Sequence, residues 1–286
     1  MRIPSFVRSP QRGVAQSLAL GLAALVVVYA ATLALFFSEG EPQWVETADA
    51  DKPVPMTAQL TAVDLQRDVV TFSFVPTISP DDSASSRRLK ASIEVTVDAG
   101  SVVQQHVFKK GEVPTAWQVS VPLAEGDVLL YPLDKHFGAF NIKARTVGGK
   151  EGVPEADLVK VVHGFGLVAT GEPNLDEGGL WVSFEVQRSR SAVFLAFMAM
   201  LSITAVVISA VVVVRQVLLG VRKGEFGMVT WAATLMFVIP TVRNTLPNSP
   251  PVGALIDFGL FFWLQVGVAA VLVLLVRAWF LDGKKA

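Results

Sequence analysis

Four stretches of the sequence contain no Asp, Glu, Lys or Arg, and this feature restricts the fold more than any other. They are Val14–Phe37, Ala192–Val214, Gly227–Val242 and Phe258–Val276. A bilayer core about 30 Å thick is crossed by roughly 20 apolar residues in a helix, with about 17 as the lower limit. The third stretch is short and needs flanking residues to reach across. We therefore expect four transmembrane helices.

Basic residues flank these stretches on alternate sides, and this pattern predicts the orientation. They precede the first stretch, separate the second from the third, and follow the fourth: Arg2, Arg8 and Arg12; Arg215, Arg222 and Lys223; Arg277, Lys284 and Lys285. The positive-inside rule places all three groups in the cytoplasm. We expect a multi-pass protein of the plasma (inner) membrane with both termini cytoplasmic and residues 38–190 outside.

The first stretch also has features of a cleaved signal peptide, since it follows three arginines and contains Ala30, Ala31 and Ala34. Secretory apolar cores run about 7 to 15 residues, and this stretch is longer. An uncleaved anchor is the favoured interpretation. Residues 38–190 lie outside under either one.

The segment 38–190 is long enough for one domain with its own core. It contains 22 Asp or Glu and 14 Lys or Arg, which gives a net charge of −8. This charge argues against a nucleic acid or a phospholipid headgroup bound through bulk electrostatics. Because the chain has no cysteine, the core alone must hold the domain, and thiolate chemistry is excluded.

Short runs in this segment alternate apolar and polar residues, which is typical of half-buried strands. The clearest is Leu89–Val97. Similar or weaker runs are Leu60–Leu65, Val70–Phe74, Val102–Phe108, Trp117–Leu123, Phe140–Ala144, Leu158–Leu167 and Leu180–Val186. Such strands, separated by turn residues, predict an antiparallel β-sandwich, so the fold class is mixed: four transmembrane α-helices and an extracytoplasmic β-domain.

These features divide the chain into nine parts. They are a cytoplasmic N-terminus 1–13, transmembrane helices 14–37, 191–217, 225–243 and 257–280, a linker 38–55, the β-sandwich 56–190, an outer proline-rich loop 244–256 and a cytoplasmic tail 281–286.

Common catalytic motifs are missing from the sequence. It has no G-x-S-x-G elbow, no H-E-x-x-H pair and no P-loop. The histidines His106, His136 and His163 are far apart, although Asp134 and His136 would share a metal if His163 lay close. Without helical i, i+4 spacing this signal is weak. We expect no catalytic residue, no cofactor and no metal, and an extracytoplasmic enzyme ranks third among the functions considered.

The most distinctive segment of the β-domain is Tyr131–His136, here called the corner. An X-Pro turn followed by an acidic residue between two strands predicts a tight structured turn. Asp134 would cap the turn while Tyr131 packs. The alternative is that Tyr131, Pro132, Asp134 and His136 form a contact point for a membrane loop or a partner.

Four prolines lie in the outer loop or just before it: Pro240, Pro247, Pro250 and Pro251. Because proline restricts the backbone, they predict a rigid connection. Arg243 and Asp257 flank this loop at the apolar boundary, where an unpaired charge is costly. We expect them to pair with each other or with the adjacent face of the β-domain, for example Asp134. Asn244 is a further interaction candidate.

Polar residues inside the apolar stretches are few. Thr230, Thr234 and Thr241 follow one face of the third stretch and Gln265 lies in the fourth, and we expect hydrogen bonds between helices. The absence of charged residues there disfavours a conventional transporter.

A set of residues after the second apolar stretch, together with the corner, resembles an uncharacterised membrane family, domain of unknown function 4436. The set is Trp231, Thr234, Leu235, Phe237, Pro240, Arg243, Asn244, Pro247, Pro250, Pro251, Gly253, Asp257, Phe261, Phe262 and Trp263. The resemblance runs from the β-domain to the C-terminus and is most specific in the proline-rich loop. It implies an actinobacterial or fungal relative and supports the architecture, but it supplies no activity.

Tyr131–Asp134 is also similar to the Phe-Pro-Phe-Asp corner of pentameric ligand-gated channels, in which a β-sandwich sits on membrane helices. This chain lacks the cysteines of the animal members, has one helix before the sandwich and three after it, and has no recognisable polar pore helix. The similarity is an analogy of fold.

The favoured function is therefore a non-enzymatic envelope protein, an accessory or scaffold subunit whose β-domain binds a partner or an envelope component. The alternative is a ligand-responsive channel or sensor subunit. The expected partners are the lipid bilayer and either a protein or further copies of the chain through the membrane helices, with no nucleic acid.

Introduced cysteines test the orientation. A cysteine at Gly149 or Ser249 should react with an impermeant thiol reagent in intact cells, and one at Gly224 should not, because the positive-inside rule places these positions on opposite sides. Protection of the cysteine at position 149 would contradict the orientation.

Overall fold

The computed structural model describes residues 23, 26–35, 37–38, 54–77, 88–146, 151–152, 154–173 and 179–282. The chain divides into two units, Met1–Glu41 and Pro42–Ala286. In the first unit, Val26–Leu35 form an apolar helix shorter than a membrane span. Half of the predicted first span, most of the linker 38–55, the cytoplasmic N-terminus, most of the C-terminal tail and Gly149 lie outside the described residues.

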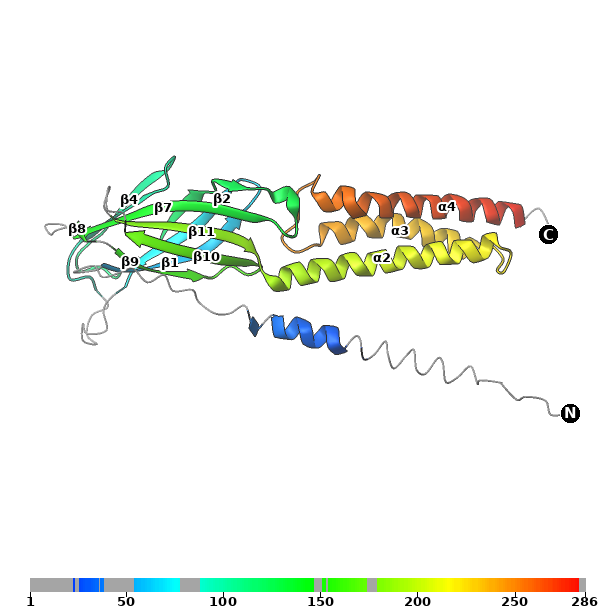
Figure 1. Ribbon diagram of the computed structural model, residues 1–286, viewed down its shortest axis with the longest axis horizontal. Coiled ribbons are helices and arrows are strands. Elements are labelled where there is room, and N and C mark those ends of the chain that lie inside the picture. The colour runs from blue at the N-terminus through cyan, green and yellow to red at the C-terminus, as the bar shows by residue number, and fades with distance from the viewer. Residues whose placement is uncertain are drawn as a thin grey trace. The chain divides into compact units, whose positions relative to one another are not determined.

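The second unit has its strands at one end and three long helices at the other (Figure 1). The strands are β1 (Val54–Asp64), β2 (Val69–Pro76), β3 (Ile93–Asp98), β4 (Val103–Phe108), β5 (Trp117–Pro122), β6 (Glu125–Gly126), β7 (Lys135–Thr146), β8 (Glu151–Gly152), β9 (Pro154–Lys160), β10 (Phe165–Pro173) and β11 (Leu180–Arg188). The 3-10 turn η1 (Val128–Leu130) lies between β6 and β7.

The strands form two sheets. One has the order β5-β2-β1-β9, and the other has the order β10-β11-β7-β3-β4, with β6 and β8 added to β7. The inner faces of the two sheets share one hydrophobic core. Phe72 of the first sheet lies with its ring centroid 5.1 Å from that of Phe140 and 5.2 Å from that of Phe184, both in the second. Aromatic contact of this kind fixes one sheet against the other.

The β-domain differs from the predicted arrangement in three places. β1 and β9 pair in parallel, so the first sheet is mixed, and the prediction of a purely antiparallel arrangement was wrong. The single run expected at Leu158–Leu167 is two strands, β9 and β10, which belong to different sheets. The strand expected from Leu89 begins at Ile93, because the backbone of Leu89 instead bonds to Gly111 and Glu112.

Three helices in the described part of the chain are long and apolar enough to cross a membrane. They are α2 (Arg190–Leu218), α3 (Phe226–Asn244) and α4 (Phe262–Asp282), the last preceded by the π-turn η2 (Asp257–Phe261). α4 packs against both α2 and α3, which contact each other less. Only Ser189 separates β11 from α2, and its hydroxyl accepts a hydrogen bond from the backbone N–H of Ala192 (3.2 Å).

The polar residues of the helices behave in two ways. The hydroxyls of Thr230, Thr234 and Thr241 each donate to the backbone carbonyl four residues earlier in the same helix, so the expected bonds between helices are not made by these threonines. Gln265 does make one, because its Nε2 donates to the carbonyl of Met236 on α3 (3.1 Å).

Candidate functional site

The corner follows β6 and η1 and runs into the first residues of β7. Asp127 caps the 3-10 turn, since its Oδ1 accepts a hydrogen bond from the backbone N–H of Leu129 (2.9 Å). The Tyr131–Pro132 peptide bond is cis, and the N–H of Leu133 donates to the carbonyl of Leu130 (3.0 Å). Asp134 therefore lies directly before β7, at the end of the β-domain that contacts the helices.

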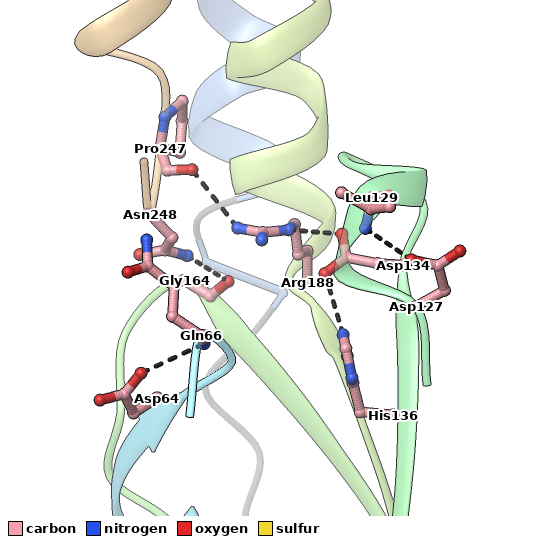
Figure 2. Close-up of polar contacts among 10 residues, drawn as sticks. All are labelled: Asp64, Gln66, Asp127, Leu129, Asp134, His136, Gly164, Arg188, Pro247 and Asn248. Carbon is pink, nitrogen blue, oxygen red and sulfur yellow. Dashed lines mark hydrogen bonds and ion pairs between the residues drawn. The ribbon is translucent and has the colours of Figure 1, made fainter. Parts of the chain in front are cut away.

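Arg188 is the last residue of β11 and connects three segments (Figure 2). Its side chain is only 2% exposed. Nε donates to Oδ1 of Asp134 (2.6 Å), and Nη1 donates to the carbonyl oxygen of Pro247 (3.4 Å) in the loop between α3 and α4. The guanidinium carbon lies 4.3 Å from the centroid of the Tyr131 ring. One buried cation thus joins β11, the corner and the α3–α4 loop.

The carboxylate of Asp134 also binds His136. Nε2 of His136 lies 3.2 Å from Oδ2 of Asp134, and the imidazole is 1% exposed. Gly126 lies against the ring: a Cβ at this glycine would come within 2.2 Å of His136 Nδ1, and its φ is +151°. A residue without a side chain is therefore required beside the histidine.

Burial opposes ionisation of Asp134, but the hydrogen bonds from His136 and Arg188 outweigh it and hold the pKa of its carboxyl below the ordinary value. Asp134 is therefore ionised at neutral pH, and its charge is matched by that of Arg188. Arg188 at the end of β11 and Asp134 just before β7 thus form a buried ion pair.

Tyr131 belongs to the β-domain in sequence but to the helices in packing. Its ring is 1% exposed and lies in the hydrophobic cluster formed by α2, α3 and α4. Its hydroxyl donates to the carbonyl of Pro247 (3.1 Å), the same oxygen that Arg188 binds. Burial raises the pKa of Tyr131 to about 12, so the hydroxyl remains a donor throughout the physiological range.

A second contact joins the β-domain to the α3–α4 loop. Nδ2 of Asn248 donates to the carbonyl of Gly164 (3.2 Å), and the backbone N–H of Ser189 donates to the same oxygen (3.0 Å). Gly164 has a φ of +83°, and a Cβ there would lie 2.8 Å from Asn248 Nδ2. Asn248 itself has a φ of +57°, a conformation that Asn adopts more readily than most residues.

The ends of the α3–α4 loop are held by the predicted pair of Arg243 and Asp257, which the structure confirms. Nε and Nη2 of Arg243 donate to the two carboxylate oxygens of Asp257 (2.9 and 2.8 Å), and Nη2 also donates to the carbonyl of Pro251 (2.7 Å). The backbone N–H of Gly253 donates to the same carboxylate (2.9 Å). The alternative partner Asp134 binds Arg188 instead. Asn244 is exposed, and its Oδ1 accepts from Arg243 (3.4 Å).

The corner, Arg188 and the α3–α4 loop contact one another at a site here called the junction. A cavity of about 310 Å³ opens beside it. Its walls come from the end of β1 and the following turn, from η1, from β10 and β11, and from the α3–α4 loop: Val63, Asp64, Leu65, Gln66, Val128, Phe165, Arg188, Asn248, Ser249 and Pro251. Both the β-domain and the α3–α4 loop therefore line the cavity. Asp64 uses its Oδ1 to accept from the N–H groups of Gln66 and Arg67 (3.1 and 3.2 Å).

The histidines take separate roles. His136 is in the junction, His106 stacks on Trp117 with centroids 5.4 Å apart, and His163 is exposed in the turn before β10. Among the residues that the structure describes, no three His, Asp or Glu side chains lie close enough to hold a metal ion.

The corner stands out in the sequence, but Arg188 was not among the predicted interaction residues. A signal for it exists: the inward positions of β11 are Leu180, Val182, Phe184, Val186 and Arg188. His136 occupies an inward position of β7 opposite Val186. A charge on an inward position requires a buried partner, so the alternation itself identifies Arg188 and points to Asp134.

The ion pair of Arg188 and Asp134 can be tested by a double-mutant cycle on the full chain in detergent. We expect Arg188→Met and Asp134→Leu each to reduce the free energy of unfolding by about 3–5 kcal/mol, because each leaves a buried charge without its partner. The double variant should lose much less than the sum. As a control, removing the partly exposed pair of Lys135 and Glu185, whose side chains are 57% and 22% exposed, should cost about 1 kcal/mol or less. Strict additivity of the two junction variants would show that the pair is not coupled.

The pH dependence of stability follows from the lowered pKa of Asp134. Its contribution is fully present above the unfolded-state pKa of about 3.9 and is lost as pH falls through the lower folded-state value. We expect the melting temperature of the unsubstituted protein to fall more steeply between pH 5 and pH 3 than that of Asp134→Asn. Parallel curves for the two proteins would contradict this expectation.

A second cycle tests the closure of the α3–α4 loop. Arg243→Ala and Asp257→Ala should each reduce stability in detergent by about 1–3 kcal/mol, because each removes charged hydrogen bonds to the other residue and to the loop backbone. The effects should be less than additive. If neither variant lowered the melting temperature, the loop would be a passive connector.

Comparison with known families divides the chain close to the junction. The model of Domain of unknown function (DUF8686) matches residues 188–282, and this range contains the proline-rich loop. The model of Domain of unknown function (DUF4436) matches residues 44–186, which is half of the chain and includes the corner. No curated protein matches the chain. Through its β-domain, the chain belongs to the family of the Domain of unknown function (DUF4436).

Proposed function

We propose that this chain is a non-enzymatic integral membrane protein of the cell envelope, an accessory or scaffold subunit whose β-domain binds a partner on the outer side of the membrane. The observation that carries the proposal is the buried bridge from Asp134 through Arg188 to the carbonyl of Pro247. A β-domain attached at several buried points is a platform whose position over the helices is fixed, as a scaffold requires.

The proposed topology has four spans, with the first provided by residues 14–37 and both termini in the cytoplasm. The start of α2 and the α3–α4 loop both contact the base of the β-domain. The loop between α2 and α3, which contains Arg222 and Lys223, lies at the other end of the same helices. This separation supports an extracytoplasmic β-sandwich under the positive-inside rule.

We propose a non-enzymatic role because ionisable side chains at the corner are already used in structural bonds. Asp134 accepts from Arg188 and His136, and the hydroxyl of Tyr131 binds a backbone carbonyl. A catalytic acid or base needs a lone pair or proton that faces a substrate. The carboxylate of Asp134 and the hydroxyl of Tyr131 are bonded to other groups of the chain instead.

The outer face of the larger sheet is the proposed partner surface. Val168, Glu185 and Phe137 lie in one row across β10, β11 and β7, and Trp181 projects from the same face of β11. Val168, Phe137 and Trp181 are each more than 40% exposed. Exposed aromatic side chains beside charged ones are typical of protein interfaces.

Site-specific photo-crosslinking in native membranes tests this function. A photoreactive residue at Val168 of the full chain should give one discrete adduct, which Trp181→Ala weakens, because both side chains belong to the proposed surface. The matched control is Gln118, which is exposed on the outer face of the other sheet and should give none. Equal adducts from both positions, or none from either, would contradict the proposal.

The second candidate is a ligand-responsive channel or sensor subunit, and one observation favours it: the cavity is lined by the β-domain and by the α3–α4 loop together. A ligand there would contact both parts at once. Ion flux through vesicles that contain the purified chain would support this candidate and not the scaffold.

A further inference from the structure

Three leucines near the corner are exposed although the chain there is tightly folded. Leu129, Leu130 and Leu133 are 44%, 50% and 65% exposed. We call them the leucine tip. A turn that faces water is ordinarily built from polar residues, Gly and Pro, so three exposed leucines at positions 129, 130 and 133 indicate a surface that meets something apolar.

The position of the leucine tip relative to the helices is fixed by the residue between its members. Tyr131 packs into the cluster formed by α2, α3 and α4, and its hydroxyl binds the carbonyl of Pro247. The corner therefore lies beside the α3–α4 loop, near the start of α4 (Figure 1). The leucine tip is held at the level where the membrane-spanning helices begin.

The neighbouring part of the helical unit is also apolar and exposed. Val252 is 90% exposed, Leu255 60% and Phe258 67%, and the surface continues along α4 with Phe262 and Trp263. α4 with its preceding π-turn is a candidate membrane span, so lipid covers this surface of the helix. Tryptophan close to the start of a span is typical of the interface between lipid and water.

We propose that the leucine tip inserts into the membrane leaflet that borders the β-domain and gives this domain a second membrane contact besides α2. The occupant is lipid because the α3–α4 loop and the start of a candidate membrane span also expose large apolar side chains. Apolar insertion also needs no positive charge, which agrees with the net charge of −8 of residues 38–190. The β-domain is thereby supported on two sides of its base.

Spin-label accessibility in vesicles tests the insertion directly. The chain contains no cysteine, so single cysteines replacing Leu130, Leu133, Phe258 and Val103 can each carry one nitroxide on the full chain in phosphatidylcholine vesicles. Phe258 is the reference within the candidate span, and Val103, 63% exposed on β4, is the reference in water. A melting curve for each labelled protein establishes that it is folded.

We expect the ratio of oxygen to water-soluble nickel collisions at Leu130 and Leu133 to be several-fold above that at Val103 and close to that at Phe258. Adding Leu133→Asp should lower the ratio at Leu130, because the charge withdraws the turn from lipid. A ratio at the leucine tip equal to that at Val103 would overturn the proposal. So would exclusion of both reagents, which would mean that protein covers the tip.

Discussion

The ion pair between Arg188 and Asp134 is the contact on which the junction depends. Two opposite charges lie at the base of a domain whose interior is mainly apolar, with side chains 2% and 0% exposed. Removing such charges from water is costly, and the cost is recovered only when geometry and hydrogen bonds are complete. Here His136 and the carbonyl of Pro247 add hydrogen bonds to the pair, and the Tyr131 ring lies against the guanidinium. The pair therefore sets where the strands end relative to the loop between the helices.

Each neighbouring contact reinforces that position. The carbonyl of Pro247 receives two donors from the β-domain, and the carbonyl of Gly164 receives one from Asn248. The loop presents these groups because Arg243 and Asp257 hold its two ends together. A single residue, Ser189, connects β11 to α2. A force on the β-domain would thus reach α2 directly and α3 and α4 through their loop.

Much of this structure follows from local sequence patterns. The apolar stretches after residue 190 predict α2, α3 and α4, and alternation predicts most strands, because each pattern reflects one buried face. The pairing of Arg243 with Asp257 follows from two charges at an apolar boundary. The parallel pairing of β1 with β9, however, depends on contacts between residues far apart in the chain. The break between β9 and β10 was missed because alternation continues through the turn that contains Gly164.

The junction itself was only partly predictable. The corner stood out through its X-Pro turn, but Arg188 was missed although it continues the inward alternation of β11. The threonines of α3 show the reverse case, since their spacing predicts contacts between helices while each hydroxyl is satisfied within its own helix. The spacing of the threonines does not reveal that each hydroxyl donates to the carbonyl four residues earlier in the same helix. Residue periodicity gives the face of an element but not the partner of a side chain.

If the β-domain and the helices form one rigid assembly, the distance between them has a single value, and a distance distribution measures this directly. Nitroxides on cysteines replacing Ser120 of β5 and Leu195 of α2 would report the separation of the two parts by double electron–electron resonance in lipid nanodiscs. We expect one narrow distribution that Arg188→Met broadens. A broad or multiple distribution in the otherwise unsubstituted chain would contradict a rigid assembly.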